Sequence, residues 1–115
     1  MAVVSGGFAP MAEWLAGKLG LDYVVANHLL TDTTTHPPTL SGLLSPTHPI
    51  IDGTQKQLLL HSIAASNNIP LSATMAVGDG ANDLLMLHAA GLGVAFRAKE
   101  KVQREVCGFL RVGFA

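Results

Sequence analysis

The sequence TMAVGDGANDLLMLHAAGLGVAF, residues 74–96, contains the pattern that decides the fold. TMAV predicts a strand, GDGAND a tight polar turn, LLMLHAAGL a helix that ends before Gly91, and GVAF a further strand. Strands that alternate with helices in this way are typical of a parallel sheet. We therefore expect an α/β layer architecture.

The region before this segment repeats the order of strand, glycine turn and helix. AVV at residues 2–4 predicts a strand that stops at Ser5-Gly6-Gly7, and the helix that follows is expected to end at Gly20. VVA at residues 24–26 predicts another strand. The apolar residues with helical spacing, and the other large side chains expected in the core, are Met11, Trp14, Leu15, Leu19, Met75 and Met86.

The middle of the chain contains an irregular stretch and then a helix. Residues 31–49 are rich in Thr, Pro, His and Ser, which indicates an irregular loop or hairpin insertion. A helical pattern starts at Thr54 and stops at Asn67-Asn68, before Pro70. We expect residues 1–115 to form a single partial domain.

Composition limits the classes of partner. The 115 residues are 49% hydrophobic and 13% charged, against about 25% charged in ordinary soluble domains. A net charge of -1 without a basic stripe argues against nucleic acid as a partner. The apolar runs are far shorter than the roughly 20 residues of a membrane helix, so we expect a cytoplasmic protein with no membrane association. Cys107 is the only cysteine and can form no internal disulfide.

The turn after the predicted TMAV strand brings two carboxylates together. Gly78 and Gly80 allow a sharp turn, and Asp83 lies one helical turn after Asp79, so both carboxylates can face one small volume. Such oxygen ligands suit Mg²⁺. An ordinary Asp-Gly turn followed by an acidic first helical turn explains less of the string GDGAND. A dinucleotide site is disfavoured because Asp83 replaces the third glycine of that fingerprint.

Two further positions are candidates for binding an anion. Ser5 and Gly6 could present a hydroxyl and backbone N–H groups to a phosphoryl oxygen. Lys56 falls in the first turn of a helix, where the helix dipole disfavours a cation unless an anion is close. An empty Ser-Gly-Gly turn and a solvated lysine are the plainer interpretations of each motif taken separately.

The order of five motifs resembles the phosphoserine phosphatases of the haloacid dehalogenase (HAD) superfamily. These motifs are VVSGGF, LGLDYVVAN, IIDGTQK, VGDGANDLLML and AGLGVAF. The resemblance implies a HAD-like, Rossmann-like parallel sheet flanked by helices, here incomplete. It also implies an Mg²⁺-dependent phosphomonoesterase that converts phosphoserine to serine and phosphate in serine biosynthesis.

The resemblance assigns roles to individual residues of this sequence. Ser5, Gly6 and Asn82 would contact substrate or phosphate, and Lys56 would neutralise the nucleophile and the phosphate. Asp79 would be an Mg²⁺ ligand, and Asp83 would support the metal site as part of the catalytic machinery.

The sequence departs from this family in three places. The 115 residues contain no Asp-x-Asp-x-Thr motif, which would supply the nucleophile, and no cap helices. Residues 33–49 look longer and more irregular than the usual hairpin, and the tail CGFLRVGFA abandons the pattern. In the family, the strand with the first motif lies between those carrying Ser5 and Asp79. We therefore expect an isolated chain with unpaired strand edges, marginal stability and no phosphatase turnover.

Two alternatives to phosphoserine hydrolysis remain open at this point. One is a non-catalytic remnant that binds phosphate or a protein partner through Ser5, Lys56 and Asp79. The other is a HAD phosphatase with a different substrate.

Overall fold

The computed structural model describes residues 1–106, so Cys107 and the tail discussed above lie outside the described residues. The chain forms two compact units. The first unit is Met1–Ile51, and the second starts at Asp52. Among the described residues, none of the helices has the length and apolar character needed to cross a membrane.

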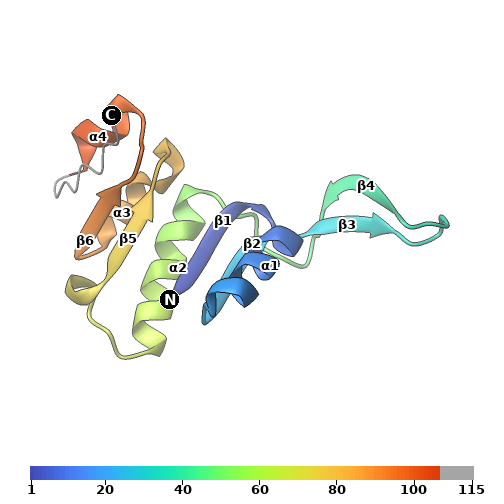
Figure 1. Cartoon of the computed structure of the whole chain (residues 1–115), viewed down its shortest axis with the longest axis horizontal. Helices are drawn as coiled ribbons and strands as arrows, with labels where there is room; N and C mark the ends of the chain where they lie inside the picture. Colours follow the sequence, from blue (N-terminus) through green and yellow to red (C-terminus); the bar gives the residue numbers. More distant parts are fainter. Residues whose placement is uncertain (107–115) are drawn as a thin grey trace. The chain divides into compact units, whose positions relative to one another are not determined.

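The first unit is built around a parallel pair of strands joined by a helix (Figure 1). Its elements are β1 (Ala2–Phe8), α1 (Ala9–Leu19), β2 (Tyr23–Asn27), β3 (Leu29–Asp32) and β4 (Thr39–Leu44). β1 and β2 run parallel, with Ala2 opposite Tyr23 and Ser5 opposite Ala26. Gly20 ends α1 in the left-handed conformation with φ of 64°, as predicted, because glycine adopts this conformation without steric cost.

β1 is longer than the sequence pattern predicted. The strand was expected to stop at Ser5, but it continues through the glycines to Phe8. The pairing register shifts between Ser5 and Phe8, where the next residue pair is Phe8 with Asn27. The glycines therefore make an irregular extension of the strand rather than a turn that ends it.

The side chains that α1 buries are not the predicted ones, since Leu15 and Leu19 are 39% and 59% exposed. Met11 and Trp14 are 77% and 65% exposed, so the prediction that they pack in the core is wrong. Ala9, Ala12 and Ala16 are buried instead. Ala9 and Ala12 form a small core with Ala26 of β2, where short side chains let the helix lie close to the strands.

The chain after β2 forms an antiparallel hairpin that extends away from the parallel pair in Figure 1. Its strands pair Thr31 with Leu40 and Asp32 with Thr39. Near the base of the hairpin, the rings of His28 and His48 stack with their centroids 3.8 Å apart.

The second unit repeats the arrangement of a parallel strand pair with helices (Figure 1). Its elements are α2 (Gly53–Ser66), the 3₁₀ turn η1 (Leu71–Ala73), β5 (Met75–Gly78), the 3₁₀ turn η2 (Ala81–Asp83), α3 (Leu84–Ala89), β6 (Leu92–Ala95) and α4 (Glu100–Glu105). β5 and β6 are parallel, with Gly78 opposite Ala95. α3 packs against both strands and against α2.

Local signals fix the ends of α2 as predicted. The Asp52 carboxylate accepts a hydrogen bond of 2.8 Å from the Gln55 N–H, which caps the first turn. Asn67 caps the other end, and the chain turns at Asn68, which has φ of 54°.

The core of the second unit contains larger side chains than that of the first. Leu87, Val102 and Val106 are its most deeply buried members, with Met86 beside them as predicted. Met75 contradicts its core prediction, because it is 64% exposed on β5. β5 alternates between this exposed face and the buried Ala76, as a strand must.

The predicted α/β class is confirmed by the two parallel pairs and their helices. Within the described residues each parallel pair is a two-stranded sheet, so β1 and β5 each pair on one side only. The single-domain assignment of residues 1–115 and the separate status of the 31–49 insertion stay predictions.

Candidate functional site

The turn after β5 carries the strongest candidate residues. β5 ends at Gly78, and Asp79 follows as the first residue beyond the strand. A Cβ atom on Gly78 would lie 2.5 Å from the Asp83 Cβ, which is far inside contact distance. Glycine at this position therefore allows the Asp83 side chain to fold under the strand end.

The Asp83 carboxylate holds this turn together from inside. It is buried, with 5% of the residue exposed. Its Oδ2 atom accepts hydrogen bonds of 3.1 Å from the N–H groups of Asp79 and Gly80. These bonds fix the backbone from which the Asp79 side chain emerges.

Lys56 is the second partner of Asp83. Its Nζ atom lies 2.7 Å from Asp83 Oδ1, and Lys56 is only 6% exposed. The anion that the sequence indicated for a lysine in the first turn of a helix is therefore the carboxylate of Asp83, 27 residues away. The pair joins the start of α2 to the turn after β5.

These contacts determine the protonation of Asp83. Burial raises the pKa of its carboxyl group, but the hydrogen bond and charge of Lys56 and the N–H groups of Gly80 and Asp79 outweigh burial. The net effect is a pKa below the ordinary value for aspartic acid. Asp83 is therefore ionised at neutral pH.

Asp79 differs from Asp83 because its side chain is exposed. It lines an open pocket of about 360 Å³ at the ends of β5 and β6, together with Val77, Gly78, Phe96 and Arg97. The two carboxylates do not share one role here: both Asp83 oxygens already accept hydrogen bonds within the protein, whereas Asp79 faces the pocket.

Asn82 lies on the same turn. Its side chain is exposed and folds back over the glycine before it, since a Cβ on Gly80 would meet Asn82 Oδ1 at 2.5 Å. The Asn82 carbonyl faces the start of α2, where a Cβ on Gly53 would meet it at 3.0 Å. The second unit thus brings together Lys56, Asp79, Asn82 and Asp83.

Ser5 and Gly6 belong to the first unit. Ser5 Oγ accepts a hydrogen bond of 3.0 Å from the Gly7 N–H, so its own hydroxyl proton remains to be donated. The Gly6 carbonyl accepts a bond of 2.8 Å from the Asn27 side chain. A hydroxyl donor held in this way can bind an oxyanion.

Two further residues, Asn27 and Arg97, contribute to these regions and were not predicted from the sequence. Asn27 is buried, and its side chain bonds both the Gly6 carbonyl and the Ile51 N–H, each at 2.8 Å. Arg97 lines the same pocket as Asp79. Arg97 lies two residues after the end of β6, and no local pattern in the sequence marks it.

A carboxylate at a strand end is a suitable ligand for a divalent cation. The described residues contain no group of three or more His, Cys, Asp or Glu side chains that could enclose a metal. Mg²⁺ does not require such a cage, because it commonly uses one or two carboxylates, several waters and a substrate phosphate. The exposed oxygens of Asp79 therefore fit a magnesium ion that is shared with a phosphate ligand.

Comparisons with known proteins agree with this arrangement. The family model of haloacid dehalogenase-like hydrolases matches residues 1–88. A phosphoserine phosphatase of Streptomyces coelicolor is 45% identical over 115 residues, which cover 99% of this chain and 26% of that protein. The chain spans 33% of the length of a probable phosphoserine phosphatase of Schizosaccharomyces pombe and 26% of the Streptomyces coelicolor protein.

Solved structures of phosphoserine phosphatases are also similar to this chain. The unliganded crystal structure of a probable phosphoserine phosphatase from Vibrio cholerae matches with a TM-score of 0.85 at 36% identity, over 97% of this chain and 33% of that one. A substrate-bound phosphoserine phosphatase complex matches with a TM-score of 0.82 at 38% identity, over 94% of this chain and 49% of that one.

Proposed function

Since the chain belongs to the haloacid dehalogenase-like hydrolase family, we propose that it forms part of an Mg²⁺-dependent phosphomonoesterase that hydrolyses phosphoserine to serine and phosphate. The observation that carries the proposal is the difference between the two carboxylates in the turn after β5. Asp83 and Lys56 fix the turn, and the exposed Asp79 carboxylate faces a pocket at the strand ends. Likeness to proteins named phosphoserine phosphatases supports the choice of substrate.

Each candidate residue has a role that its chemistry allows. Asp79 would hold the Mg²⁺, and Asn82 and the hydroxyl of Ser5 would donate hydrogen bonds to the substrate or its phosphate. The Gly6 N–H would contribute a further donor. Bound Mg²⁺ would neutralise phosphate charge and orient the phosphoryl group.

The proposed role of Lys56 follows from its buried ion pair with Asp83. Its ammonium group is held by Asp83 Oδ1, so its position is fixed before any ligand arrives. We propose that Lys56 adds positive charge beside the phosphate from this fixed position. Asp83 would act through Lys56 and through the backbone of Asp79, as a positioning residue.

The activity belongs to a complete enzyme, and a hybrid protein tests it. Residues 1–115 would replace the matching segment of the Streptomyces coelicolor phosphoserine phosphatase, and phosphate release from phosphoserine would be measured with and without Mg²⁺. We expect Mg²⁺-dependent turnover in the hybrid and none in the isolated 115-residue chain, because the aspartyl nucleophile of the family is not among these residues.

Variants of the hybrid separate the chemistry from folding. D79N is expected to abolish Mg²⁺-dependent turnover, whereas E105Q, which alters an exposed carboxylate on α4, should leave it unchanged. A folded hybrid without turnover would contradict the proposed reaction and favour a non-catalytic, phosphate-binding role. Turnover only with other phosphomonoesters would favour a different substrate within the family.

A further inference from the structure

The pocket beside Asp79 is lined by a second charged residue, Arg97. Phe96 donates its N–H to the Gly78 carbonyl at 2.9 Å, which is a ladder bond of the last pair of β5 and β6, Gly78 with Ala95. Asp79 and Phe96 therefore follow the last paired positions of two adjacent parallel strands, and Arg97 is the next residue after Phe96. Both line the pocket, with Val77 and Phe96 as its apolar part.

Arg97 has a backbone conformation that is costly for its residue type. Its φ is 48°, in the left-handed region. In the part of the chain that the structure describes, the other non-glycine residue with positive φ is Asn68, and asparagine tolerates this conformation well. Glycine or asparagine would suit position 97 better on conformational grounds. An arginine held there in a pocket wall indicates that its side chain serves a function.

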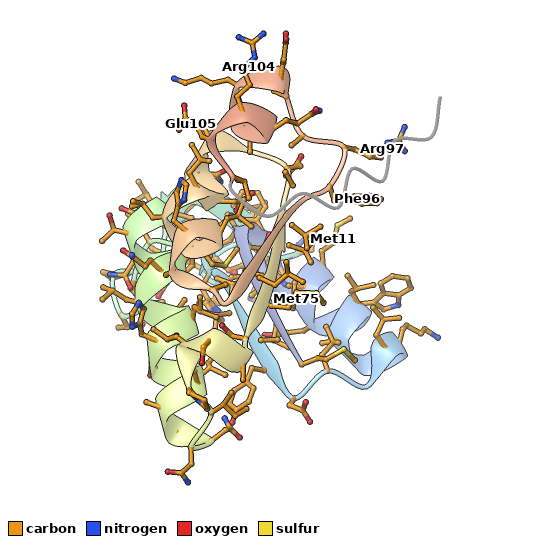
Figure 2. The ribbon with its side chains drawn as sticks, turned by 90° about the vertical axis from the view of Figure 1, so that its left-hand side faces the viewer. Met11, Met75, Phe96, Arg97, Arg104 and Glu105 are labelled. Carbon is orange, nitrogen blue, oxygen red and sulfur yellow. The ribbon has the colours of Figure 1, made fainter. Side chains whose placement is uncertain are left out.

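The charge of Arg97 is not paired with an acidic group among the described residues. Two basic groups of the second unit are in ion pairs, Lys56 with Asp83 and Arg104 with Glu100, whereas Lys99 and Lys101 are exposed like Arg97 and form no ion pair among residues 1–106. Within residues 1–106, Arg97 forms no ion pair. Figure 2 shows Arg97 and Phe96 on the segment that joins β6 to α4, with both side chains projecting from the same side of it in this view.

We infer that Arg97 is an anion-binding residue of this pocket. Its guanidinium group would hold an oxyanion of the ligand, and Asp79 would hold the Mg²⁺. The guanidinium group offers N–H donors in a fork that matches carboxylate and phosphate oxygens. The inference rests on the proposed function, because the ligand is a phosphomonoester. A phospho-amino acid presents two such oxyanions, its phosphate and its carboxylate.

The test measures binding to the 115-residue chain in the presence of Mg²⁺ by isothermal titration calorimetry. The two probes are O-phosphoserine and O-phosphoethanolamine, which lacks the carboxylate. We expect R97Q to weaken phosphoserine binding by about tenfold or more, which is the usual effect of losing a charged hydrogen bond. R104Q is the matched control, since Arg104 is an exposed arginine that already pairs with Glu100.

The two probes identify which oxyanion Arg97 holds. Equal weakening for both probes assigns Arg97 to the phosphate, and weakening for phosphoserine alone assigns it to the carboxylate. R97G should bind as poorly as R97Q but unfold at the same temperature as the wild type or higher, because glycine adopts the left-handed conformation freely.

Three outcomes would overturn the inference: no saturable binding of either probe to the wild-type chain, equal affinities of R97Q and the wild type, or equal losses in R97Q and R104Q. Failure of the proposed reaction gives a different result. An inactive hybrid with Arg97-dependent binding would count against hydrolysis and leave the role of Arg97 in place.

Discussion

Each unit has a buried polar side chain that ties distant segments together, and the two differ in charge. In the first unit the neutral Asn27 amide joins Gly6 to Ile51. In the second unit the charged pair Lys56–Asp83 joins α2 to the turn after β5. A neutral bridge loses only hydrogen bonds when it is broken, whereas a broken ion pair leaves a buried charge. The difference predicts where the chain is most sensitive to substitution.

Loss of one member of the ion pair should have the largest effect. We expect K56M to lower the free energy of unfolding of the second unit by about 3–5 kcal/mol, because Asp83 would remain ionised and buried. Urea unfolding followed by amide hydrogen exchange would report each unit separately. The control is E100Q, which breaks the exposed pair with Arg104 and should cost less than about 1 kcal/mol. Equal effects of the two variants would refute this explanation.

Crowding at the turn should have the next largest effect. In G78A the new Cβ would lie 2.5 Å from the Asp83 Cβ, and we expect the second unit to lose about 1–3 kcal/mol of stability. Gly17 in α1 has no atom within 4 Å of the same added carbon. G17A should therefore stabilise the first unit by about 0.5–1 kcal/mol. A G78A variant as stable as the wild type would show that the turn can move away from the added atom.

Removing the neutral Asn27 bridge should lower stability by about as much as crowding the turn at Gly78, or somewhat less. N27A leaves the Gly6 carbonyl and the Ile51 N–H without their partner, and we expect a loss of about 1–3 kcal/mol in the first unit. Faster hydrogen exchange of the Ile51 amide would be the direct measurement. S41A removes an exposed hydrogen bond to the Leu30 carbonyl and should change stability by less than about 0.5 kcal/mol.

Acid should cause the smallest loss of stability. The loss should come from protonation of Asp83 in the Lys56–Asp83 ion pair. The pKa of Asp83 is lowered in the folded chain, so its contribution to stability is complete above the unfolded value of about 3.9. The contribution is lost as the pH falls through the lower folded pKa. The second unit should therefore become less stable below about pH 4. The double variant K56M/D83N should lack this part of the slope, and an unchanged slope would assign acid sensitivity to other groups.

Local chemistry predicted most elements of both units, because their ends depend on nearby residues, but α4 was not predicted. Gly20, Asp52 and Asn67 end or begin helices through their own backbone and side-chain preferences. The face of α1 was predicted wrongly, since hydrophobic spacing favoured Met11 and Trp14, whereas close packing on the strands selects the alanines.

The sequence predicted most residues of the candidate site, but it did not predict which of their side chains bond to each other. The string GDGAND identified Asp79 and Asp83 as functional candidates, and the helix dipole indicated that Lys56 needs an anion. Neither could show that Asp83 satisfies Lys56, because the two residues meet only after α2 packs against α3 and η2. Arg97 was missed because no local motif marks an arginine with a left-handed backbone.

The hydrogen bonds from Asp79 and Gly80 to Asp83 also bear on the entropy of binding. A loop that orders only when its ligand arrives loses conformational entropy at that moment, which weakens the affinity. The turn that carries Asp79 is already ordered by a buried carboxylate. Ligand binding at this turn should therefore have a small entropic penalty, and the affinity should depend mainly on the contacts that the ligand itself makes.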